Sequence, residues 1–347
     1  MVALLIADLT GIRRLKLDKS VIGLLVLTCF FCCEACGEED GNELKALPAS
    51  VPAPPDNRLS IAKVELGKAL FFDPRLSGDN KMSCSTCHLP EKAFGDGLRR
   101  AKGAGDKELS RNSQTLYNVG FYGTLFWDGR AKSLEEQALI PIESPDEMNQ
   151  NVDELVIELA AVPFYESQFK KVFGREVNKH DIAKAIASFQ RTLVTPNSPF
   201  DRYLAGEKNA LSSIAKQGLE LFRGDAGCVR CHNGSLLSDG KFYRLGVGRN
   251  DEGRGAITKE RADQFKFRTP SLRNVAETAP YMHDGSQATL FEVVQFYYRD
   301  VPTKGPGGLE LDIEPLTGQS FSDIDAIVEF LKSLTGELPQ VVPPKIP

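Results

Sequence analysis

Residues 84–88 read Cys-Ser-Thr-Cys-His, and residues 228–232 read Cys-Val-Arg-Cys-His. On a helical turn this spacing presents both thiols on one side, where they can form thioethers with the two vinyl groups of a haem. The histidine that follows then faces the iron as an axial ligand. The two segments therefore predict two covalently bound haem c groups, whose protein ligands are Cys84, Cys87, His88, Cys228, Cys231 and His232.

Two other uses of a Cys-x-x-Cys pair compete with this interpretation. A single pair can be half of a zinc site or a redox disulfide, and two pairs together can form a four-cysteine zinc site. The histidine that directly follows both pairs favours haem, and so does the export signal described below.

The composition is that of an ordinary globular protein. Hydrophobic residues make up 41% and charged residues 26% of the 347 residues, which excludes a disordered or membrane-spanning body. The chain is long enough for two domains, each with its own core. The formal net charge is -5, so nothing suggests nucleic acid as a partner, and an acidic face would suit a basic electron-donor protein.

Residues 1–36 have the pattern of an export signal. Basic residues between Arg13 and Lys19 precede an apolar run from Val21 to Cys33, which is too short to span a bilayer. Haem is attached to c-type cytochromes outside the cytoplasm, so the signal and the two motifs together predict the bacterial periplasm.

The end of this signal leaves a lipid anchor open. Cys36, directly after Ala35, fits the acylated first residue of a lipoprotein tethered to the membrane. In the alternative, the cysteines here are small apolar residues of a cleaved peptide. The cysteines concerned are Cys29, Cys32, Cys33 and Cys36. The sequence also leaves the oligomeric state open, a homodimer included.

A helical pattern precedes each haem motif. Apolar residues recur at helical spacing from Ile61 to Phe71 and again from Leu211 to Phe222. Both runs contain the form Gly-x-x-Leu-Phe, starting at Gly67 and at Gly218, which indicates an internal repeat. A glycine in mid-helix normally costs stability, so its recurrence predicts a close helix crossing in both halves.

Two further helices complete this pattern. Asp181–Leu193 has helical periodicity, and Thr195–Pro199 breaks it. The last helix is expected to start at Ser322 as N-cap, with Asp325 as capping partner, and to run to Gly336. No segment of any length alternates as a strand does. The predicted fold class is therefore mainly α, with two tandem cytochrome c-like domains.

The predicted organisation has four parts. Residues 1–36 are the signal peptide, and residues 37–57, rich in proline and acidic residues, are a tether or linker. Residues 58–205 form the N-terminal haem domain, and residues 206–347 form the C-terminal haem domain.

Between and after the haem motifs the sequence resembles the bacterial diheme cytochrome c peroxidase family, which includes the MauG enzymes. Four segments carry the resemblance: Phe126–Ala131, Glu136–Met148, Thr269–Val275 and Pro280–Gly285. The resemblance implies that hydrogen peroxide reacts at the N-terminal haem. It also implies that electrons enter at the C-terminal haem from a small donor protein, a cytochrome c or a cupredoxin.

The same resemblance assigns three residues to the reaction. Trp127 matches a tryptophan between the haems that relays electrons, Glu147 matches the acid-base carboxylate, and Gln137 would orient peroxide or water. Heterolysis of the O–O bond needs a proton moved from one peroxide oxygen to the other, which a carboxylate can do. Taken alone, Trp127 also fits a core aromatic and Glu147 a solvated surface acid.

The axial ligands depart from the family's peroxidase pattern. Many family peroxidases carry a histidine between the first motif and the tryptophan that blocks the iron, but residues 89–126 contain none. We therefore expect an open, high-spin N-terminal haem that needs no reductive activation. Tyr297 stands where peroxidases have an axial methionine and MauG-type members a tyrosine, although Met282 is a nearby candidate and Tyr297 also fits a core aromatic.

The resemblance further implies a calcium ion between the domains, bound by oxygens of Asn112, Thr278 and Pro280. Of the remaining histidines, His180 is expected to be solvated at a helix start. His283 is expected near the second haem as a hydrogen-bonding partner rather than a ligand.

Three functions follow from these expectations. The first is a periplasmic cytochrome c peroxidase that uses Glu147 for proton transfer and Trp127 for electron sharing. The second is a MauG-like oxidase that modifies residues of a partner protein, favoured by Tyr297 and the open first haem. The third is a noncatalytic electron carrier with two low-spin haems, against which the lack of a second histidine or methionine near the first motif argues.

Overall fold

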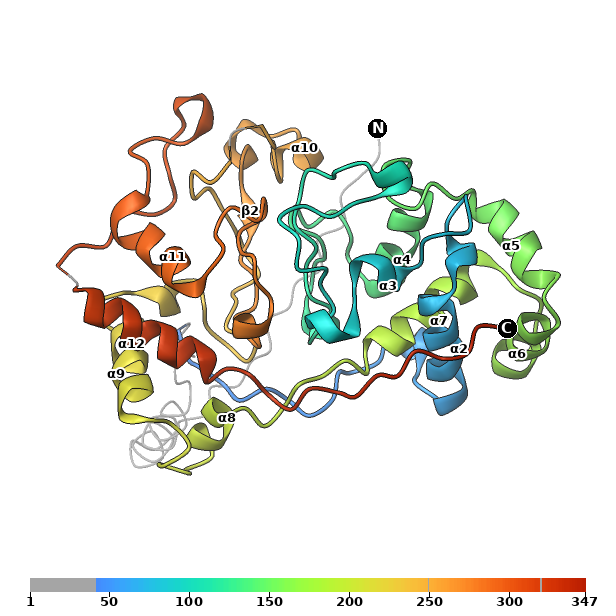
Figure 1. The fold of residues 1–347 in the computed structure, drawn as a ribbon, viewed down its shortest axis with the longest axis horizontal. Helices are drawn as coiled ribbons and strands as arrows, with labels where there is room; N and C mark the ends of the chain where they lie inside the picture. The colour runs from blue at the N-terminus through green and yellow to red at the C-terminus, as the bar shows by residue number, and fades with distance from the viewer. Residues whose placement is uncertain (1–41, 249, 319) are drawn as a thin grey trace, which may run out of the picture. The chain divides into compact units, whose positions relative to one another are not determined.

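The structure is a computed structural model that describes residues 42–248, 250–318 and 320–347 (Figure 1). The predicted signal peptide and its cysteines lie outside the described residues. Residues 42–347 form one compact unit. In this described part of the chain, no helix has the length and apolar character needed to cross a membrane.

The described chain is mainly helical, as predicted. The helices are α2 (Ile61–Phe72), α3 (Cys84–Cys87), α4 (Leu134–Glu143), α5 (Val152–Ala160), α6 (Pro163–Phe173), α7 (Lys179–Gln190), α8 (Pro199–Leu204), α9 (Ser213–Arg223), α10 (Gly255–Thr258), α11 (Leu290–Gln295) and α12 (Phe321–Lys332). The strands β1 (Phe242–Tyr243) and β2 (Phe267–Arg268) pair antiparallel, with Phe242 opposite Arg268.

Each half of this unit is built on one pair of packed helices. In the first half α2 packs against α7, and in the second half α9 packs against α12. A Cβ atom at Gly67 would overlap the carbonyl oxygen of Ala185, and one at Gly218 would overlap that of Ala326. Both glycines therefore allow a backbone-to-backbone helix crossing, which confirms the repeat predicted from the sequence.

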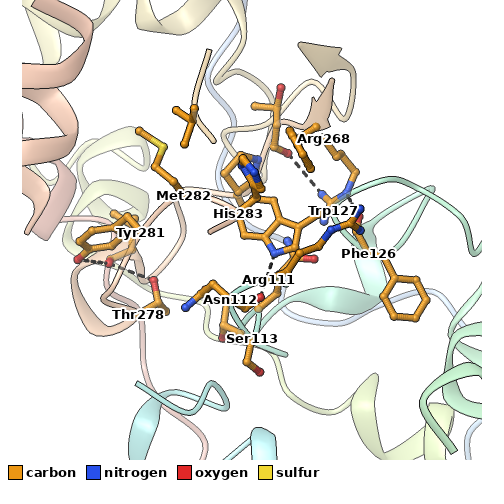
Figure 2. A pocket seen from close by; sticks show the side chains of 18 of the residues that line it. Arg111, Asn112, Ser113, Phe126, Trp127, Arg268, Thr278, Tyr281, Met282 and His283 are labelled. Atoms are coloured by element: carbon orange, nitrogen blue, oxygen red, sulfur yellow. Dashed lines mark hydrogen bonds between the residues drawn. The ribbon is translucent and has the colours of Figure 1, made fainter. Parts of the chain in front are cut away.

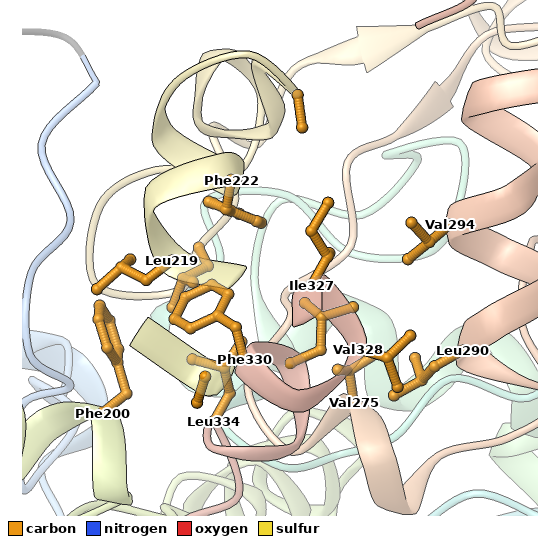
Figure 3. Packing of buried hydrophobic residues seen from close by; sticks show 14 of the residues in the cluster. Phe200, Leu219, Phe222, Val275, Leu290, Val294, Ile327, Val328, Phe330 and Leu334 are labelled. Carbon is orange, nitrogen blue, oxygen red and sulfur yellow. The ribbon is translucent and has the colours of Figure 1, made fainter. Parts of the chain in front are cut away.

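The buried aromatic rings repeat in the same way. Phe71 of α2 lies 5.1 Å from Phe189 of α7, and Phe222 of α9 lies 5.0 Å from Phe330 of α12, measured between ring centroids. Figure 3 shows Phe330 within the second cluster, near Phe222 and Phe200. The apolar core thus consists of related helix pairs, each held by an aromatic contact.

The chain passes from the hydrophobic clusters of the first half to the cluster of the second half between Leu193 and Phe200. Leu193 belongs to a cluster of the first half, whereas Phe200 of α8 packs with the second. We call residues 58–194 the first half and residues 199–334 the second half; the domain boundary near residue 205 stays a prediction.

The N-terminal end of the described chain packs on the second half, and the C-terminal end packs on the first half. Leu44, in the described part of the predicted linker, belongs to the cluster of the second half. The C-terminal tail runs from α12 back toward α2 and α7 (Figure 1), where Val341 and Ile346 pack on the first half and Arg75 donates to the Pro347 carbonyl. Each end thus adds contacts to the half from which it is distant in sequence.

The predicted helices exist, with some changes at their ends. α7 begins at Lys179 and ends at Gln190, short of the expected Leu193. The prediction for the last helix was wrong at its start: Ser320, not Ser322, is the N-cap, and it forms a capping box with Asp323. Both Ser-x-x-Asp patterns are present, and use of the first adds Phe321 to the helix, where its ring stacks on Phe291.

Candidate active site

One cavity of about 1570 Å³ is lined by both Cys-x-x-Cys-His segments. A pocket for a single small ligand typically has about 300–1,000 Å³, so this cavity exceeds that range. The predicted residues outside the two motifs all line it; they are Asn112, Trp127, Gln137, Glu147, Thr278, Pro280 and Tyr297. The fold therefore brings together every residue proposed from the sequence.

The first motif forms a helical turn, as the thioether spacing requires. Cys84–Cys87 is α3, and the His88 amide donates to the Cys84 carbonyl over 3.1 Å. The His88 ring nitrogen Nδ1 lies 2.9 Å from the Phe94 carbonyl oxygen. Because a carbonyl can only accept, Nδ1 carries the proton, which leaves Nε2 free to bind a metal.

The second motif repeats this arrangement. The His232 amide donates to the Cys228 carbonyl over 2.9 Å, and His232 Nδ1 lies 2.9 Å from the Leu237 carbonyl oxygen. Burial lowers the pKa of both His88 and His232, so both imidazoles are neutral at pH 7. Both histidines are thus held in the tautomer and charge state of a metal ligand.

The four thiols are free and neutral. Cys84, Cys87, Cys228 and Cys231 form no disulfide in the structure, and burial raises the pKa of Cys84 to about 12 and of Cys87 to about 11. Among residues 42–248, 250–318 and 320–347, no group of three or more His, Cys, Asp and Glu side chains could hold a metal ion. The two cysteine pairs therefore do not meet as a four-thiolate zinc site.

Trp127 lies at the contact between the halves (Figure 2). Its indole Nε1 donates to the Asn112 carbonyl over 3.0 Å, and the Asn112 amide donates to the His283 carbonyl over 2.8 Å. The Trp127 carbonyl accepts from the Arg268 amide of β2 over 2.8 Å. The indole is thus held by Asn112 of the first half, and the Trp127 backbone by Arg268 of the second half, which suits a group whose position between two sites matters.

The His283 ring packs against aromatic rings. It stacks on Phe267 with 3.6 Å between centroids and meets Trp127 edge-on at 6.5 Å. Burial lowers its pKa to about 4, so the ring is neutral. Its role as a hydrogen-bonding partner near the second haem stays a prediction. His180 is exposed near the start of α7, as predicted.

Glu147 and Gln137 line the first-half side of the cavity. Gln137 is on α4, and Glu147 follows α4 in a turn whose Met148 amide donates back to the Pro141 carbonyl. Burial raises the pKa of Glu147, and the nearby Arg130 opposes this shift. A partly buried carboxyl with a raised pKa holds its proton more readily than a solvated one, which suits a group that takes and returns a proton.

The loop of residues 99–111, part of the stretch without histidine, closes against the Glu147 turn. The Ala104 amide donates to the Glu147 carbonyl over 2.8 Å, and a Cβ at Gly103 would overlap the Asp146 carbonyl. Cys87 Sγ lies 3.5 Å from the Lys102 carbonyl. This loop therefore fixes the backbone of the proposed acid-base residue beside the first motif.

Tyr297 lies beside the second motif. It is in a single π-helical turn, Phe296–Asp300, that continues α11. Burial raises its pKa, and Cys228 and Cys231 add smaller contributions because they are close. π-Helical turns are rare and frequently occur at functional sites. Met282, the other candidate ligand, also lines the cavity.

The three residues expected to bind calcium, Asn112, Thr278 and Pro280, all line the cavity, and Figure 2 shows Asn112 and Thr278. The amide nitrogen of Asn112 donates to the Leu98 carbonyl over 2.8 Å, and Thr278 Oγ1 donates to the Val275 carbonyl over 3.2 Å. Asn112 and Thr278 act as hydrogen-bond donors in these two bonds. The lone pairs of Asn112 Oδ1 and of the Thr278 oxygens are therefore left to bind a cation.

Sequence reasoning missed an ionic link between the halves. The Arg111 guanidinium bonds Asp251 through two nitrogens, at 2.6 and 2.8 Å, and Asp128 at 2.6 Å. Asp251 is far from the other two in sequence, so no local pattern indicated the contact. Asp128, however, directly follows Trp127 within a segment of the family resemblance.

The backbone carbonyls that orient the two histidines were also missed. Phe94 and Leu237 have φ of 55° and 49°, an uncommon conformation for such side chains. A signal was available: an Asp-Gly pair follows each of them, at 96–97 and 239–240. This second repeat marks the turn that presents each carbonyl.

The residues present fit two haem groups. Each half offers a neutral imidazole whose Nε2 can bind iron, with a pair of free thiols on the same helical turn for the vinyl groups. The cavity that both motifs line combines apolar side chains such as Leu116, Ile186 and Ile327 with many polar and charged ones, so it offers both apolar surface and hydrogen-bonding groups to a cofactor.

Comparisons with known proteins agree with this chemistry. The sequence model of the di-haem cytochrome c peroxidase family matches residues 61–209. The methylamine utilization protein MauG of Methylorubrum extorquens is 41% identical over 334 residues, covering 93% of this chain and 94% of the relative. The cytochrome-c peroxidase IdrP1 of Pseudomonas sp. strain SCT is 41% identical over 356 residues, covering 92% of each chain.

A solved structure agrees as well. The crystal structure of a MauG-like protein associated with microbial copper homeostasis superposes with a TM-score of 0.75 at 33% identity, covering 84% of this chain and 94% of that one. These similarities extend over almost the whole described chain. The chain therefore belongs to the di-haem cytochrome c peroxidase family, whose members are oxidoreductases that carry two haem groups and act with peroxide.

Proposed function

We propose that this protein is a periplasmic peroxidase that reduces hydrogen peroxide to water with electrons from a small redox protein, a cytochrome c or a cupredoxin. The observation that carries the proposal is the position of Glu147, a carboxyl with a raised pKa in the cavity wall of the first half. The periplasmic location rests on the export signal at residues 1–36 and on the haem motifs.

The chain's residues would divide the work as follows. Cys84, Cys87 and His88 would hold the first haem, which would supply the iron for the reaction with peroxide, and Cys228, Cys231 and His232 would hold the second haem, which would supply electrons. Glu147 takes a proton from one peroxide oxygen and returns it to the other, while Gln137 orients the peroxide by hydrogen bonding. One peroxide, two protons and two electrons yield two waters.

Trp127 would carry electrons between the halves. Its indole donates to the Asn112 carbonyl of the first half, and its backbone carbonyl accepts from the Arg268 amide of the second half. The calcium ion expected at Asn112, Thr278 and Pro280 would keep this contact in register, because these residues come from both halves. Each half would then be a cytochrome c-like domain with one covalent haem.

The direct test is steady-state peroxide consumption by the purified diheme protein with a reduced small cytochrome c or cupredoxin as donor. Turnover should require both peroxide and donor, and should fall strongly in Glu147→Gln. Peroxide consumption equal to that of Glu147→Gln would contradict the proposal.

A MauG-like oxidase that modifies residues of a partner protein is a second candidate. It is favoured by the position of Tyr297 beside Cys228 and Cys231, where a tyrosine oxygen would be a harder iron ligand than methionine sulfur. Incubation with peroxide and candidate partner proteins, followed by mass spectrometry, separates the two. New partner modifications without donor oxidation would favour the oxidase.

A further inference from the structure

Gln190, the last residue of α7, has a buried side-chain oxygen without a hydrogen-bond partner among the described residues. Its side chain is only 4% exposed and lines the cavity. Among the described residues, none donates a hydrogen bond to its buried Oε1. A buried amide oxygen left unpaired costs stability, so a partner from outside the protein chain is expected.

The internal repeat shows which residue occupies the same place in the second half. Ala185 and Ala326 contact the helical glycines, Phe189 and Phe330 make the aromatic contacts, and Leu193 and Leu334 accept from the amides of two asparagines. The first member of each pair lies in α7 or just after it, and the second lies in α12 or just after it. The two members are separated by the same number of residues in every pair. The two helices therefore correspond residue by residue.

By this correspondence Gln190 matches Leu331, and Ile186 matches Ile327. All four side chains line the cavity. Leu331 is 5% exposed and belongs to the apolar cluster of α12, whose neighbours Ile327 and Phe330 are visible in Figure 3. The fold thus accepts a leucine at this place, so packing does not require the carboxamide in the first half.

Gln190 shares its wall with the proposed peroxide-orienting residue. α7 packs against α4, and α4 carries Gln137 together with the cavity-lining Ala138 and Pro141. A polar residue that breaks the apolar pattern only in the half that also carries Gln137 and Glu147 indicates a functional requirement there.

We propose that the Gln190 carboxamide is a third hydrogen-bonding group of the peroxide site, binding water in the resting protein and hydrogen peroxide in turnover. This inference rests on the proposed function of the first half. Water and peroxide both donate and accept, so either satisfies the carboxamide in both of its orientations. An ionised carboxylate, such as a haem propionate, only accepts and would leave Oε1 unpaired.

The test compares Gln190→Leu with the matched variant Leu331→Gln, both as proteins with full haem content. Mixing with peroxide should give a second-order rate of optical change roughly three- to tenfold lower in Gln190→Leu, the effect of one hydrogen bond. The loss should appear in KM more than in kcat. Thermal unfolding of Gln190→Leu should be unchanged or occur at a higher temperature, because an unpaired buried amide is removed.

Leu331→Gln should behave in the opposite way. It adds an unpaired amide to the second half, so its unfolding temperature should fall while its rate with peroxide stays at the wild-type value. A Gln190→Leu protein that unfolds earlier yet reacts with peroxide at the wild-type rate would show a structural role and overturn the inference.

Fluoride binding to the ferric protein separates this inference from the proposed function. Fluoride does not turn over, and it accepts hydrogen bonds only, so it would take its bond from the Nε2–H of the Gln190 carboxamide in the flipped orientation. Gln190→Leu removes this donor and should bind fluoride several-fold more weakly. Suppose that the wild-type protein does not react with peroxide and that Gln190→Leu still binds fluoride more weakly than wild type. This result would contradict the proposed function and support Gln190 as a ligand-binding group. Equal fluoride affinity and equal peroxide rates would overturn the inference.

Discussion

The two proximal histidines show how single residues prepare this site. His88 and His232 each donate Nδ1–H to a carbonyl that follows the motif, on Phe94 and on Leu237. Both carbonyl-bearing residues have positive φ, a conformation that costs roughly 1–3 kcal/mol and is found mostly at functional sites. The repeated strain is consistent with histidines that must present Nε2 in a fixed direction.

Glu147 gives a prediction for the pH dependence. Burial raises its pKa above the ordinary value of 4.5, and peroxide must lose its first proton to the ionised form. The rate with peroxide should therefore fall as the pH drops through this raised pKa. Glu147→Gln should lower the rate by roughly 10²–10⁴-fold and abolish this acidic limb. A pH–rate profile that keeps the same limb in Glu147→Gln would assign it to another group.

Tyr297 and its neighbour Tyr298 form a natural pair of variants. Tyr297→Phe should change the optical and paramagnetic spectrum of the second haem and leave that of the first unchanged. Tyr298 has a buried hydroxyl without a partner in the described chain, so Tyr298→Phe should leave the spectra unchanged and not destabilise the protein. A wild-type spectrum in Tyr297→Phe would exclude this residue as an iron ligand.

At the level of the elements, the helix crossings are the most demanding contacts of the fold. Gly67→Ala places a methyl group on the Ala185 carbonyl, so we expect a loss of at least about 1–3 kcal/mol in the free energy of unfolding. Gly123→Ala meets no atom within 4 Å and should change it by less than about 0.5 kcal/mol. Denaturant unfolding of both variants compares them; equal stabilities would contradict the close crossing.

The helices themselves could be predicted because their signals are local. Apolar periodicity gave α2, α7, α9 and α12, and the repeated glycines gave their crossings. The start of α12 was misplaced because Ser320 and Ser322 both precede a capping aspartate, and the choice depends on Phe321 reaching Phe291. Tertiary contacts of this kind leave no local trace in the sequence.

For the whole molecule, the halves meet at a buried threonine. Thr195 Oγ1 accepts from the amides of both Asn118 and Asn274, which occupy corresponding places in the two halves. Thr195→Val would leave both buried amides unpaired and cost about 1–3 kcal/mol for each. Thr303→Val, at an exposed site, is the control and should change the unfolding free energy by less than about 0.5 kcal/mol. Thermal unfolding that does not distinguish them would show that this bridge adds no stability.

The predicted site residues came from motifs and resemblance, and the cavity contains all of them. What the sequence did not show are contacts between distant segments, such as Arg111 with Asp251 and the matching of Gln190 with Leu331. The sequence contains these residues, but only the fold places them together. Polar residues whose role depends on contacts with distant segments are therefore not predicted from local sequence patterns.

The central claim is that the first haem offers an open position and the second is closed by Tyr297. The most direct test is the electron paramagnetic resonance and optical spectrum of the isolated diferric protein, followed by addition of peroxide without reductant. We predict one high-spin and one low-spin haem and a prompt optical change on peroxide addition. Two low-spin haems that do not respond to peroxide until one is reduced would contradict the account.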